Sequence, residues 1–369
     1  MDVLIFTNIP SPYRVDFFNE LGKHLNLTVV FEAKTARGLR FNWNLDKISS
    51  FKAVFLKDGD MYEKKINWKV LKYIDKDKYD YIIVTNYSYL TEMVALLYLK
   101  IHRIPYFLEI DGGIIKQENT LKKLFKRFLI KNATGYFSPS RVSDEYLKYY
   151  GANKKNIYRY PFTSLNNQDI LAKPISKYEK ESLRSELGIK EKKVVLAVGR
   201  FIYIKGFDVL LKASIELEQE VAIVFVGGVP PKEYIDIKEK HNLQNIYFEG
   251  FKKKKELNKY YKVADVFVLP TRGDVWGLVI NEAMGFGLPI ITTEKCIAGL
   301  ELIEDGVNGY IIPVNNHNIL AETINELLYS ENLINHIPKN NLMKIRNYTI
   351  KKMVDAHLNV FMKNKGAEI

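Results

Sequence analysis

The segment "FVLPTRGDVWGLVINEAMGFGLPIITT", residues 267–293, has the pattern of a buried strand, a loop, a helix and a second buried strand. Its two apolar runs are typical of parallel strands that helices cover on both faces. The helix is expected to begin near Gly277 and to continue through "LVINEAMGF". Its first amides, those of Gly277, Leu278 and Val279, have no acceptor within the helix, so they can bind a phosphate oxygen.

Two carboxylates stand eight positions apart in this segment, Asp274 in the loop and Glu282 inside the helix. A carboxylate just before a helix N-terminus can accept hydrogen bonds from sugar hydroxyls. Glu282 has apolar neighbours and needs a polar partner such as a ribose. The alternatives are an acid stabilised by the helix dipole for Asp274 and an ion pair with a lysine for Glu282. The pattern favours ligand binding over both alternatives.

A second strand–loop–helix pattern, "VLAVGRFIYIKGFDVLLKA", places Arg200 and Lys205 after a strand that ends at Gly199. Two cations beyond a strand end and beside a helix N-terminus are suited to binding a diphosphate. The alternative is a loop with two solvated basic residues. Because the 267–293 segment supplies groups suited to a sugar, we favour the diphosphate site.

Strand and helix patterns alternate along all 369 residues, which predicts an α/β protein with doubly wound parallel sheets. The polar, strand-free stretch that follows residue 162 suggests a boundary between an N-terminal domain, 1–165, and a C-terminal domain, 166–346. A last helix within 347–369 can pack back on the first domain. Two such domains facing each other would place a ligand cleft between the carboxyl ends of their strands. In the first half, strands are expected at 3–7, 27–32, 52–56, 81–86, 105–110, 135–140 and 157–161.

The composition is that of a globular protein with a basic surface: 47% of the residues are hydrophobic, 27% are charged, and the formal net charge is +12. An anionic partner is therefore expected. The single cysteine, Cys296, excludes an intrachain disulfide and fits a reducing cytoplasm. The start of the chain lacks the basic leader of a signal peptide, and no apolar run reaches the ~20 residues of a spanning helix. We expect a cytoplasmic protein, either free or peripheral on the inner face of the plasma membrane.

Four elements, "VGRFIYIKG", "NIYFEG", "ADVFVLPTRGDVWGLVINEAMGFGLPIITT" and "LIEDGVNGYIIP", resemble in order and spacing the C-terminal domain of family-4 retaining glycosyltransferases. The resemblance is strongest over residues 195–313. It implies the GT-B fold, in which two doubly wound, Rossmann-like domains face each other across a cleft. It also implies a nucleoside diphosphate sugar as donor and transfer with retention of configuration, without a metal or other cofactor.

The resemblance assigns the donor diphosphate to Arg200 and Lys205, and the donor sugar and its ribose to Asp274 and Glu282. The family usually has glutamate as the first acid, so the shorter Asp274 must lie closer to the sugar. Trp276 replaces a smaller aromatic residue.

The loop after "IYFEG" is expected to recognise the base through backbone groups of Gly250, Phe251 and Lys252. Packing beneath the loop is the alternative for Phe251. We include Gly199 among the donor-binding candidates because it closes the strand before the two cations.

The N-terminal domain carries "TNIPSPYRVDFFNEL" after its first strand and resembles the opening of bacterial polysaccharide glycosyltransferases of this family. A glycine-rich loop is usual at this place, and this segment has none. Asn8, Tyr13 and Arg14 are therefore the candidates for contact with donor phosphate or acceptor. A later strand ends in "YFLEIDGG", where relatives often place a histidine. Asp111 is the candidate there for acceptor contact or proton transfer, with a turn-forming Asp-Gly-Gly as the alternative.

The segment "TLKKLFKRFLIK", residues 120–131, predicts a basic amphipathic helix that can rest on an anionic membrane. The alternative is a helix whose apolar face packs on the core while its basic face is solvated. If the membrane hypothesis holds, the acceptor is lipid-linked. The apolar face consists of Leu121, Leu124, Phe125, Phe128 and Leu129.

The expected function is transfer of a sugar from a nucleoside diphosphate sugar to a lipid-linked or oligosaccharide acceptor. A UDP-sugar is favoured as the donor, with a GDP-sugar as the alternative. The resemblance indicates synthesis of capsule, exopolysaccharide or O-antigen. The six histidines show no metal-ligand spacing, and no nucleic-acid-binding motif is present. The alternatives are a nucleotide-sugar epimerase or hydrolase of the same fold and a non-catalytic polyanion-binding protein.

Overall fold

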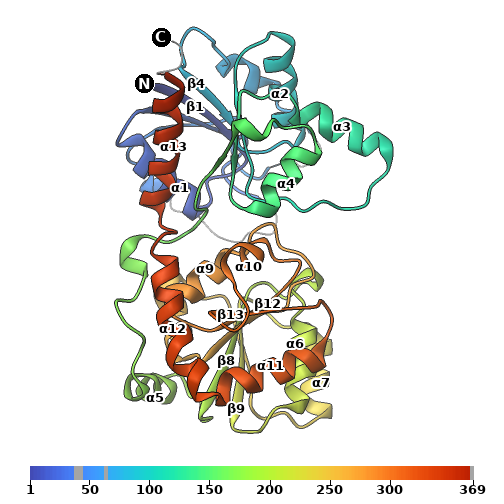
Figure 1. Cartoon of the computed structure of the whole chain (residues 1–369), viewed down its shortest axis with the longest axis vertical. Coiled ribbons are helices and arrows are strands. Elements are labelled where there is room, and N and C mark those ends of the chain that lie inside the picture. Colours follow the sequence, from blue (N-terminus) through green and yellow to red (C-terminus); the bar gives the residue numbers. More distant parts are fainter. Residues whose placement is uncertain (37–44, 62–64, 366–369) are drawn as a thin grey trace. The chain divides into compact units, whose positions relative to one another are not determined.

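The structure, a computed structural model, describes residues 1–36, 45–61 and 65–365 and consists of two compact units. Unit 1 comprises residues 1–164 and the chain from Thr349 onward, and unit 2 comprises residues 165–348. Each unit contains one parallel sheet connected by helices (Figure 1). The α/β class predicted from the alternating patterns is confirmed.

The sheet of unit 1 has the strand order β3-β2-β1-β4-β5-β6-β7. The order changes direction between β1 and β4, so the carboxyl ends of these strands form a topological switch point, where open α/β sheets bind ligands. The strands are β1 (Asp2–Thr7), β2 (Asn26–Phe31), β3 (Lys52–Phe55), β4 (Tyr81–Val84), β5 (Phe107–Glu109), β6 (Gly135–Ser138) and β7 (Ile157–Arg159). The helices are α1 (Pro12–Gly22), α2 (Leu90–Ile101), α3 (Thr120–Ile130), α4 (Arg141–Tyr149) and α13 (Ile350–Lys365).

The sheet of unit 2 has the strand order β10-β9-β8-β11-β12-β13, with its switch point between β8 and β11. The strands are β8 (Lys193–Val198), β9 (Val221–Val226), β10 (Ile246–Glu249), β11 (Val266–Leu269), β12 (Ile290–Thr293) and β13 (Gly309–Ile312). The helices are α5 (Lys177–Glu186), α6 (Phe207–Ala213), α7 (Lys232–Lys240), α8 (Lys254–Val263), α9 (Leu278–Gly285), α10 (Ile297–Leu302), α11 (His317–Tyr329) and α12 (Glu331–Ile345).

The central strands are apolar on both faces because helices cover both faces of each sheet. All six side chains of β9, "VAIVFV", are buried, none more than 1% exposed. Such continuous apolar runs distinguish doubly covered parallel strands from strands with one solvated face. The strands of both units therefore hold the loops at their carboxyl ends on a rigid framework.

Helix α13 follows unit 2 in the chain but packs in unit 1, beside α1 (Figure 1). Its Phe361 is fully buried, and the Phe361 ring stacks on Tyr81 of β4 with ring centroids 4.7 Å apart. The Tyr81 hydroxyl donates a hydrogen bond of 2.7 Å to the Phe361 carbonyl. Unit 1 thus includes a segment that lies far from the rest of the unit in sequence.

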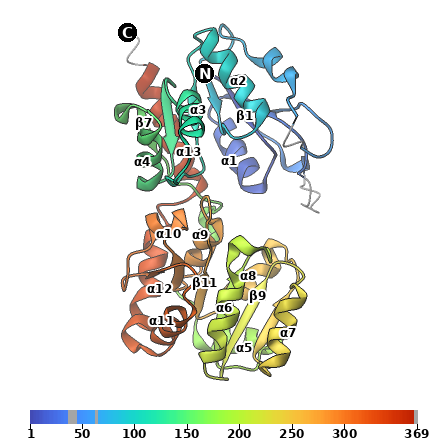
Figure 2. The same ribbon diagram turned by 90° about the vertical axis from the view of Figure 1, so that its right-hand side faces the viewer.

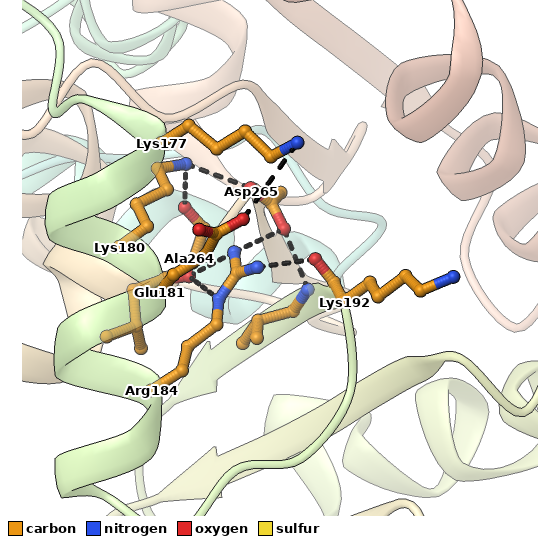
Figure 3. A network of polar contacts seen from close by, with 9 residues as sticks. Lys177, Lys180, Glu181, Arg184, Lys192, Ala264 and Asp265 are labelled. Atoms are coloured by element: carbon orange, nitrogen blue, oxygen red, sulfur yellow. Dashed lines mark hydrogen bonds and ion pairs between the residues drawn. The ribbon is translucent and has the colours of Figure 1, made fainter.

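Helix α5 is attached to the amino ends of β8 and β11 through Asp265 (Figure 3). Arg184 and Lys180 donate to the two carboxylate oxygens at 2.7 and 2.9 Å, and the amide of Val194 donates at 2.8 Å. A pocket of about 830 Å³ opens beside this network. It lies at the amino ends of the strands, the opposite edge of the sheet from the candidate donor-binding loops.

Candidate functional site

The switch point of unit 2 brings together Lys205 and Asp274. Lys205 ends a short 3-10 turn, Tyr203–Lys205, in the loop after β8, and Asp274 lies in the loop after β11. The Lys205 ammonium donates a hydrogen bond to Asp274 Oδ2 and forms an ion pair with it. Both side chains are partly buried, 19% and 17% exposed. A cation and a carboxylate, suited to a phosphate and a sugar hydroxyl, therefore lie in contact where this fold class binds ligands.

Arg272 fixes the turn that carries Lys205. Its guanidinium binds Asp208 of α6 in a bidentate arrangement, at 2.8 and 2.6 Å, and donates to the Tyr203 carbonyl at 2.6 Å. It also stacks on the Tyr203 ring, 4.0 Å from the centroid. The backbone amide of Arg272 donates to Ile204 at 2.7 Å, so the two loops are bonded through both main chain and side chain. The sequence analysis did not identify Arg272 or Asp208 as functional residues. The available signal was the carboxylate of Asp208 in the first turn of α6.

Helix α9 begins at Leu278, one residue after the predicted start, with Gly277 as its N-cap residue. Gly277 has φ of 103°, and a Cβ there would lie 2.9 Å from the sulfur of Cys296, so the position favours glycine. Buried Trp276 donates its indole N–H to Asn281 at 2.7 Å. The amides of Leu278 and Val279, in the first turn of α9, have no acceptor within the helix.

Glu282 lies in α9, as predicted, and one of its polar contacts is with Tyr261 of α8. The Tyr261 hydroxyl donates to Glu282 Oε2 at 2.9 Å. Burial raises the pKa of Tyr261 well above its usual range, and the nearby Glu282 carboxylate raises it further, so the phenol keeps its proton. Tyr261 was not among the residues expected from the sequence. In the sequence, Tyr261 is an aromatic residue at helical spacing, a pattern that is typical of an ordinary core residue.

Arg200 is exposed, and the described residues provide it with no ion pair. Gly199 is half-buried at the end of β8. In the loop after β10, Gly250 is exposed and Phe251 is 55% exposed. Lys252 pairs with Glu249 at 2.9 Å. These residues follow strands of one sheet, and a Cβ at Gly199 would lie 3.8 Å from the Lys205 side chain.

In unit 1, Arg14 lies on α1 but does not face an open surface. It is buried, and its guanidinium binds Glu109 through Nη1 and Asp111 through Nη2. Its charge is therefore balanced inside the unit. Tyr13 donates to the second oxygen of Asp111 at 3.3 Å, and Asn8 accepts from the next amide, that of Ile9, at 2.7 Å.

His357 of α13 also contacts this cluster. Its Nε2 lies 3.3 Å from Glu109 Oε2, and both side chains are fully buried. In sequence, His357 stands at helical spacing from apolar Met353 and Phe361, and that spacing does not indicate a charged partner 248 residues away. The Asp111 side chain is 31% exposed and is the member of the cluster most open to solvent.

Helix α3 presents four of its apolar residues to solvent. Its inward face consists of Lys123, Lys126, Leu129 and Ile130. The Lys123 ammonium lies 4.1 Å from the Tyr149 ring centroid, and Lys126 pairs with Glu118 at 2.8 Å. Figure 2 shows α3 and α4 beside each other, as these contacts require. The alternative, in which the apolar face packs on the core, is wrong for four residues. Their exposed fractions are 79% for Leu121, 56% for Leu124, 49% for Phe125 and 54% for Phe128.

Among residues 1–36, 45–61 and 65–365, no group of three or more His, Cys, Asp or Glu side chains is arranged to hold a metal ion. In the same part of the chain, no helix has the length and hydropathy needed to span a bilayer.

The two-unit architecture matches solved glycosyltransferases of the GT-B fold, which confirms the predicted fold class. The cyanobacterial protein Anabaena Alr3699/HepE, solved in complex with UDP and glucose, aligns over 98% of this chain and 100% of its own, with a TM-score of 0.77 and 17% identity. WaaG, described as a glycosyltransferase involved in lipopolysaccharide biosynthesis, aligns over 97% and 99% with a TM-score of 0.70 and 16% identity. At these identities the likeness concerns the fold.

Sequence comparison gives a closer relation for part of the chain. Residues 179–343 match the family model described as glycosyl transferases group 1. Spore coat protein SA of Bacillus subtilis is 35% identical over 203 residues, 50% of this chain and 53% of that one. O-antigen chain mannosyltransferase C of Escherichia coli is 28% identical over 170 residues, 45% of each chain. The chain thus spans about half the length of these curated relatives, and unit 2 contains a glycosyl transferases group 1 domain.

Proposed function

We propose that the protein is a metal-independent, retaining glycosyltransferase of family 4. The donor is a nucleoside diphosphate sugar, UDP-linked in preference to GDP-linked, and the acceptor is a lipid-linked or other oligosaccharide in bacterial capsule, exopolysaccharide or O-antigen synthesis. The observation that carries this proposal is the contact between Lys205 and Asp274 at the switch point of a group 1 domain. The UDP and glucose named for the HepE complex and the mannosyltransferase name of the E. coli relative support the same substrate class.

The site provides each group that the transfer requires. Lys205, the exposed Arg200 and the first-turn amides of α9 bind the diphosphate and stabilise the charge that develops on it as it leaves. We assign to these cations the charge stabilisation that a metal ion gives elsewhere. Asp274 accepts hydroxyl groups of the donor sugar, and Glu282, held by Tyr261, accepts those of the ribose.

In the reaction, the bond between the anomeric carbon and the diphosphate oxygen breaks, and the anomeric carbon bonds to the acceptor oxygen. The acceptor hydroxyl proton passes to the leaving phosphate oxygen. Attack from the face that the diphosphate leaves retains the configuration. This stereochemistry rests on the resemblance to family 4.

The test begins with thermal unfolding in the presence of UDP, GDP and a panel of their sugar derivatives, because a ligand of the native state raises the melting temperature. Transfer is then measured as release of nucleoside diphosphate. Arg200→Ala and Lys205→Ala are each expected to lower turnover by about 10²-fold, the usual effect of losing one charge-stabilising donor. Lys259→Ala, which removes a lysine paired with Glu186 on the surface of unit 2, is the matched control. Wild-type turnover in both site variants would exclude the diphosphate site.

We also propose that α3 binds the protein to an anionic lipid bilayer, where a lipid-linked acceptor resides. Its outward residues Leu121, Leu124, Phe125 and Phe128 are accompanied by exposed Lys122 and Arg127. Apolar side chains beside lysine and arginine complement the acyl chains and anionic headgroups of such a bilayer. Lys100 of α2 donates to the carbonyls of Phe128 and Lys131, so the end of α3 is anchored to unit 1.

Flotation with phosphatidylglycerol–phosphatidylcholine vesicles tests this surface. The double variant Leu121→Ser/Phe128→Ser is expected to lower binding by about ten-fold or more, because two large apolar side chains no longer enter the bilayer. Trp68→Ser/Ile101→Ser is the matched control, since these side chains are 63% and 76% exposed elsewhere on unit 1. Equal losses in both double variants, or equal binding to pure phosphatidylcholine, would contradict the proposal.

A further inference from the structure

Four titratable side chains from three distant parts of the chain meet inside unit 1: Arg14, Glu109, Asp111 and His357. Arg14 bridges the two carboxylates, and His357 contacts the carboxylate oxygen of Glu109 that Arg14 leaves free. With both ring nitrogens of His357 protonated, two positive charges would face two carboxylates in this arrangement. Glu109 and His357 are fully buried, and the side chain of Arg14 is 3% exposed, so solvent screens these charges little.

Both ring nitrogens of His357 lie within reach of an oxygen acceptor. Its Nδ1 lies 2.8 Å from the Met353 carbonyl oxygen, and its Nε2 lies 3.3 Å from Glu109 Oε2. A carbonyl oxygen only accepts, so Nδ1 carries a hydrogen. Burial alone would raise the pKa of Glu109, but the charge of Arg14 and the hydrogen bonds from His357 and Arg14 lower that pKa to about 2. Glu109 Oε2 can therefore accept a hydrogen bond from Nε2, and a ring with hydrogens on both nitrogens would satisfy both contacts.

Aromatic side chains hold the imidazole ring of His357 in place. The Phe137 ring stacks on it with centroids 4.1 Å apart and planes 21° apart, and Phe17 lies 4.9 Å away. The titratable groups nearest to the ring and to Glu109 are Arg14 from α1 and Tyr160 after β7. The Tyr160 hydroxyl donates to the Ile110 carbonyl at 2.9 Å, which fixes the backbone between the two carboxylates.

Solvent exposure rises along the chain of contacts, from His357 and Glu109 at 0% to Asp111 at 31%. Arg14 holds Asp111 Oδ1, and Tyr13 approaches Oδ2 at a longer 3.3 Å, so Oδ2 retains accepting capacity. Asp111 follows β5 at the carboxyl edge of the sheet, where open α/β sheets bind ligands. The buried part of the cluster thus supports one carboxylate at the surface.

We infer that Glu109 and His357 are positioning residues that fix Arg14, and through it Asp111, as the acceptor of a hydrogen bond from the incoming hydroxyl group of the acceptor saccharide. The assignment of that hydroxyl rests on the proposed function. Without the charge of His357, Glu109 and Asp111 compete for Arg14 alone, and Asp111 loses its fixed orientation.

Nuclear magnetic resonance of the ring nitrogens of His357 tests the positioning network independently of any substrate. In the whole protein at neutral pH, both nitrogens are expected to show directly bonded hydrogens, and Glu109→Gln is expected to remove one of them. The carboxyl carbon resonance of Asp111 is expected to move in His357→Gln. It should not move in Phe361→Leu, a control that disturbs the same helix without touching Glu109. A singly protonated ring in the wild type, or an unmoved Asp111 resonance, would overturn the inference.

Kinetics then tests the hydroxyl contact, with the membrane fraction of the source organism as acceptor. His357→Phe is expected to lower transfer at least ten-fold, and His357→Gln, which keeps an N–H for Glu109, less than that. UDP should stabilise both variants as it does the wild type, and Phe361→Leu should transfer within about two-fold of the wild-type rate. If Phe361→Leu and His357→Phe lower the transfer rate equally, His357 contributes only to the packing of α13. If the wild type transfers nothing while the resonances behave as stated, the proposed function fails and the network stands.

Discussion

Lys205 and Asp274 are bonded side chain to side chain although 69 residues separate them in sequence. Each belongs to the loop after one of the two strands at the switch point of unit 2. Because the pair is less than one-fifth exposed, solvent screens it only in part. A diphosphate that binds the Lys205 ammonium must therefore compete with the Asp274 carboxylate.

This competition predicts that loss of the Asp274 charge strengthens binding of UDP but slows transfer of the sugar. Asp274→Asn removes the competing charge, so UDP is expected to bind about three- to ten-fold more tightly, as for a partly exposed ion pair of about 1 kcal/mol. Transfer of the sugar is expected to fall because a donor contact is lost. Calorimetric titration with UDP and a turnover assay measure the two effects.

Glu186→Gln is the control for the change in net charge, because Glu186 pairs with Lys259 on α8. It should leave UDP affinity and turnover unchanged. If Asp274→Asn weakens UDP binding as strongly as Lys205→Met does, the two side chains bind the diphosphate jointly and do not compete.

The glycine after Lys205 predicts a second result. Gly206 has φ of 68°, and a Cβ there would lie 2.0 Å from the Pro270 carbonyl oxygen. Gly206→Ala is expected to lower the free energy of unfolding by about 3 kcal/mol or more, since backbone strain and a steric clash add. Gly188→Ala is the matched control: φ there is 70° and a Cβ meets nothing within 4 Å. It should cost about 1–2 kcal/mol, the strain alone. Chemical denaturation compares the free energies of unfolding of the two variants. Equal decreases would mean that the loop containing Pro270 moves aside to accept the new methyl group.

Arg272 predicts an effect on binding without direct ligand contact. Arg272→Lys loses the bidentate bond to Asp208 and the flat stacking on Tyr203, neither of which an ammonium group reproduces. The turn that carries Lys205 is then less fixed, and UDP affinity is expected to fall about five- to ten-fold. The melting temperature of unit 2 should change little by comparison. An unchanged UDP affinity would show that the main-chain bonds from the β11 loop suffice.

Glu92 predicts an unusual pH dependence of stability. It lies in the first turn of α2, is 2% exposed, and neither of its carboxylate oxygens has a hydrogen-bond partner in the described part of the chain. Burial, and then the nearby Glu32 carboxylate, raise its pKa from 4.5 to about 8. The folded protein therefore retains a proton that the unfolded chain releases above pH 4.5, and the stability falls as the pH rises from about 4.5 to about 8.

Glu92→Gln removes this ionisation from the unfolded state. At pH 7 the variant is expected to gain up to about 3 kcal/mol in free energy of unfolding, with no gain below pH 4. Urea denaturation over pH 4 to 8 measures the difference. The exposed Glu239 of α7 gives the control Glu239→Gln, which should follow the wild type because both states expose the group alike. If the gain in free energy of unfolding does not vary with pH, the effect of Glu92→Gln comes from packing and not from ionisation.

The strands and the loops after them could be predicted because apolar runs and glycine or proline turns are local in sequence. The same holds for Lys205 and Asp274, whose positions follow directly from strand ends. The contacts of Tyr261 and Arg272 were missed because their positions in sequence do not indicate a partner. Tyr261 has the spacing of an ordinary core aromatic, and Arg272 stands in a loop.

Two features depended on tertiary contacts alone. The periodicity of α3 shows two faces but not which face turns inward. Lys123 and Lys126 turn inward because aromatic residues and Glu118 accept their charges. The bond between Glu109 and His357 joins residues on opposite sides of the whole of unit 2 in the chain. No local pattern can encode such a pairing.

The return of α13 to unit 1 has a consequence for biosynthesis. Unit 2 is continuous in the chain and is complete when residue 348 has left the ribosome, whereas unit 1 still lacks the helix that covers Tyr81 and contacts Glu109. During translation the first unit to be made is therefore the last to be finished. A nascent chain halted before His357 would carry a complete unit 2 and an unfinished unit 1, in which Glu109 keeps Arg14 but lacks its contact with His357. Chaperones and proteases can distinguish that form from the finished protein.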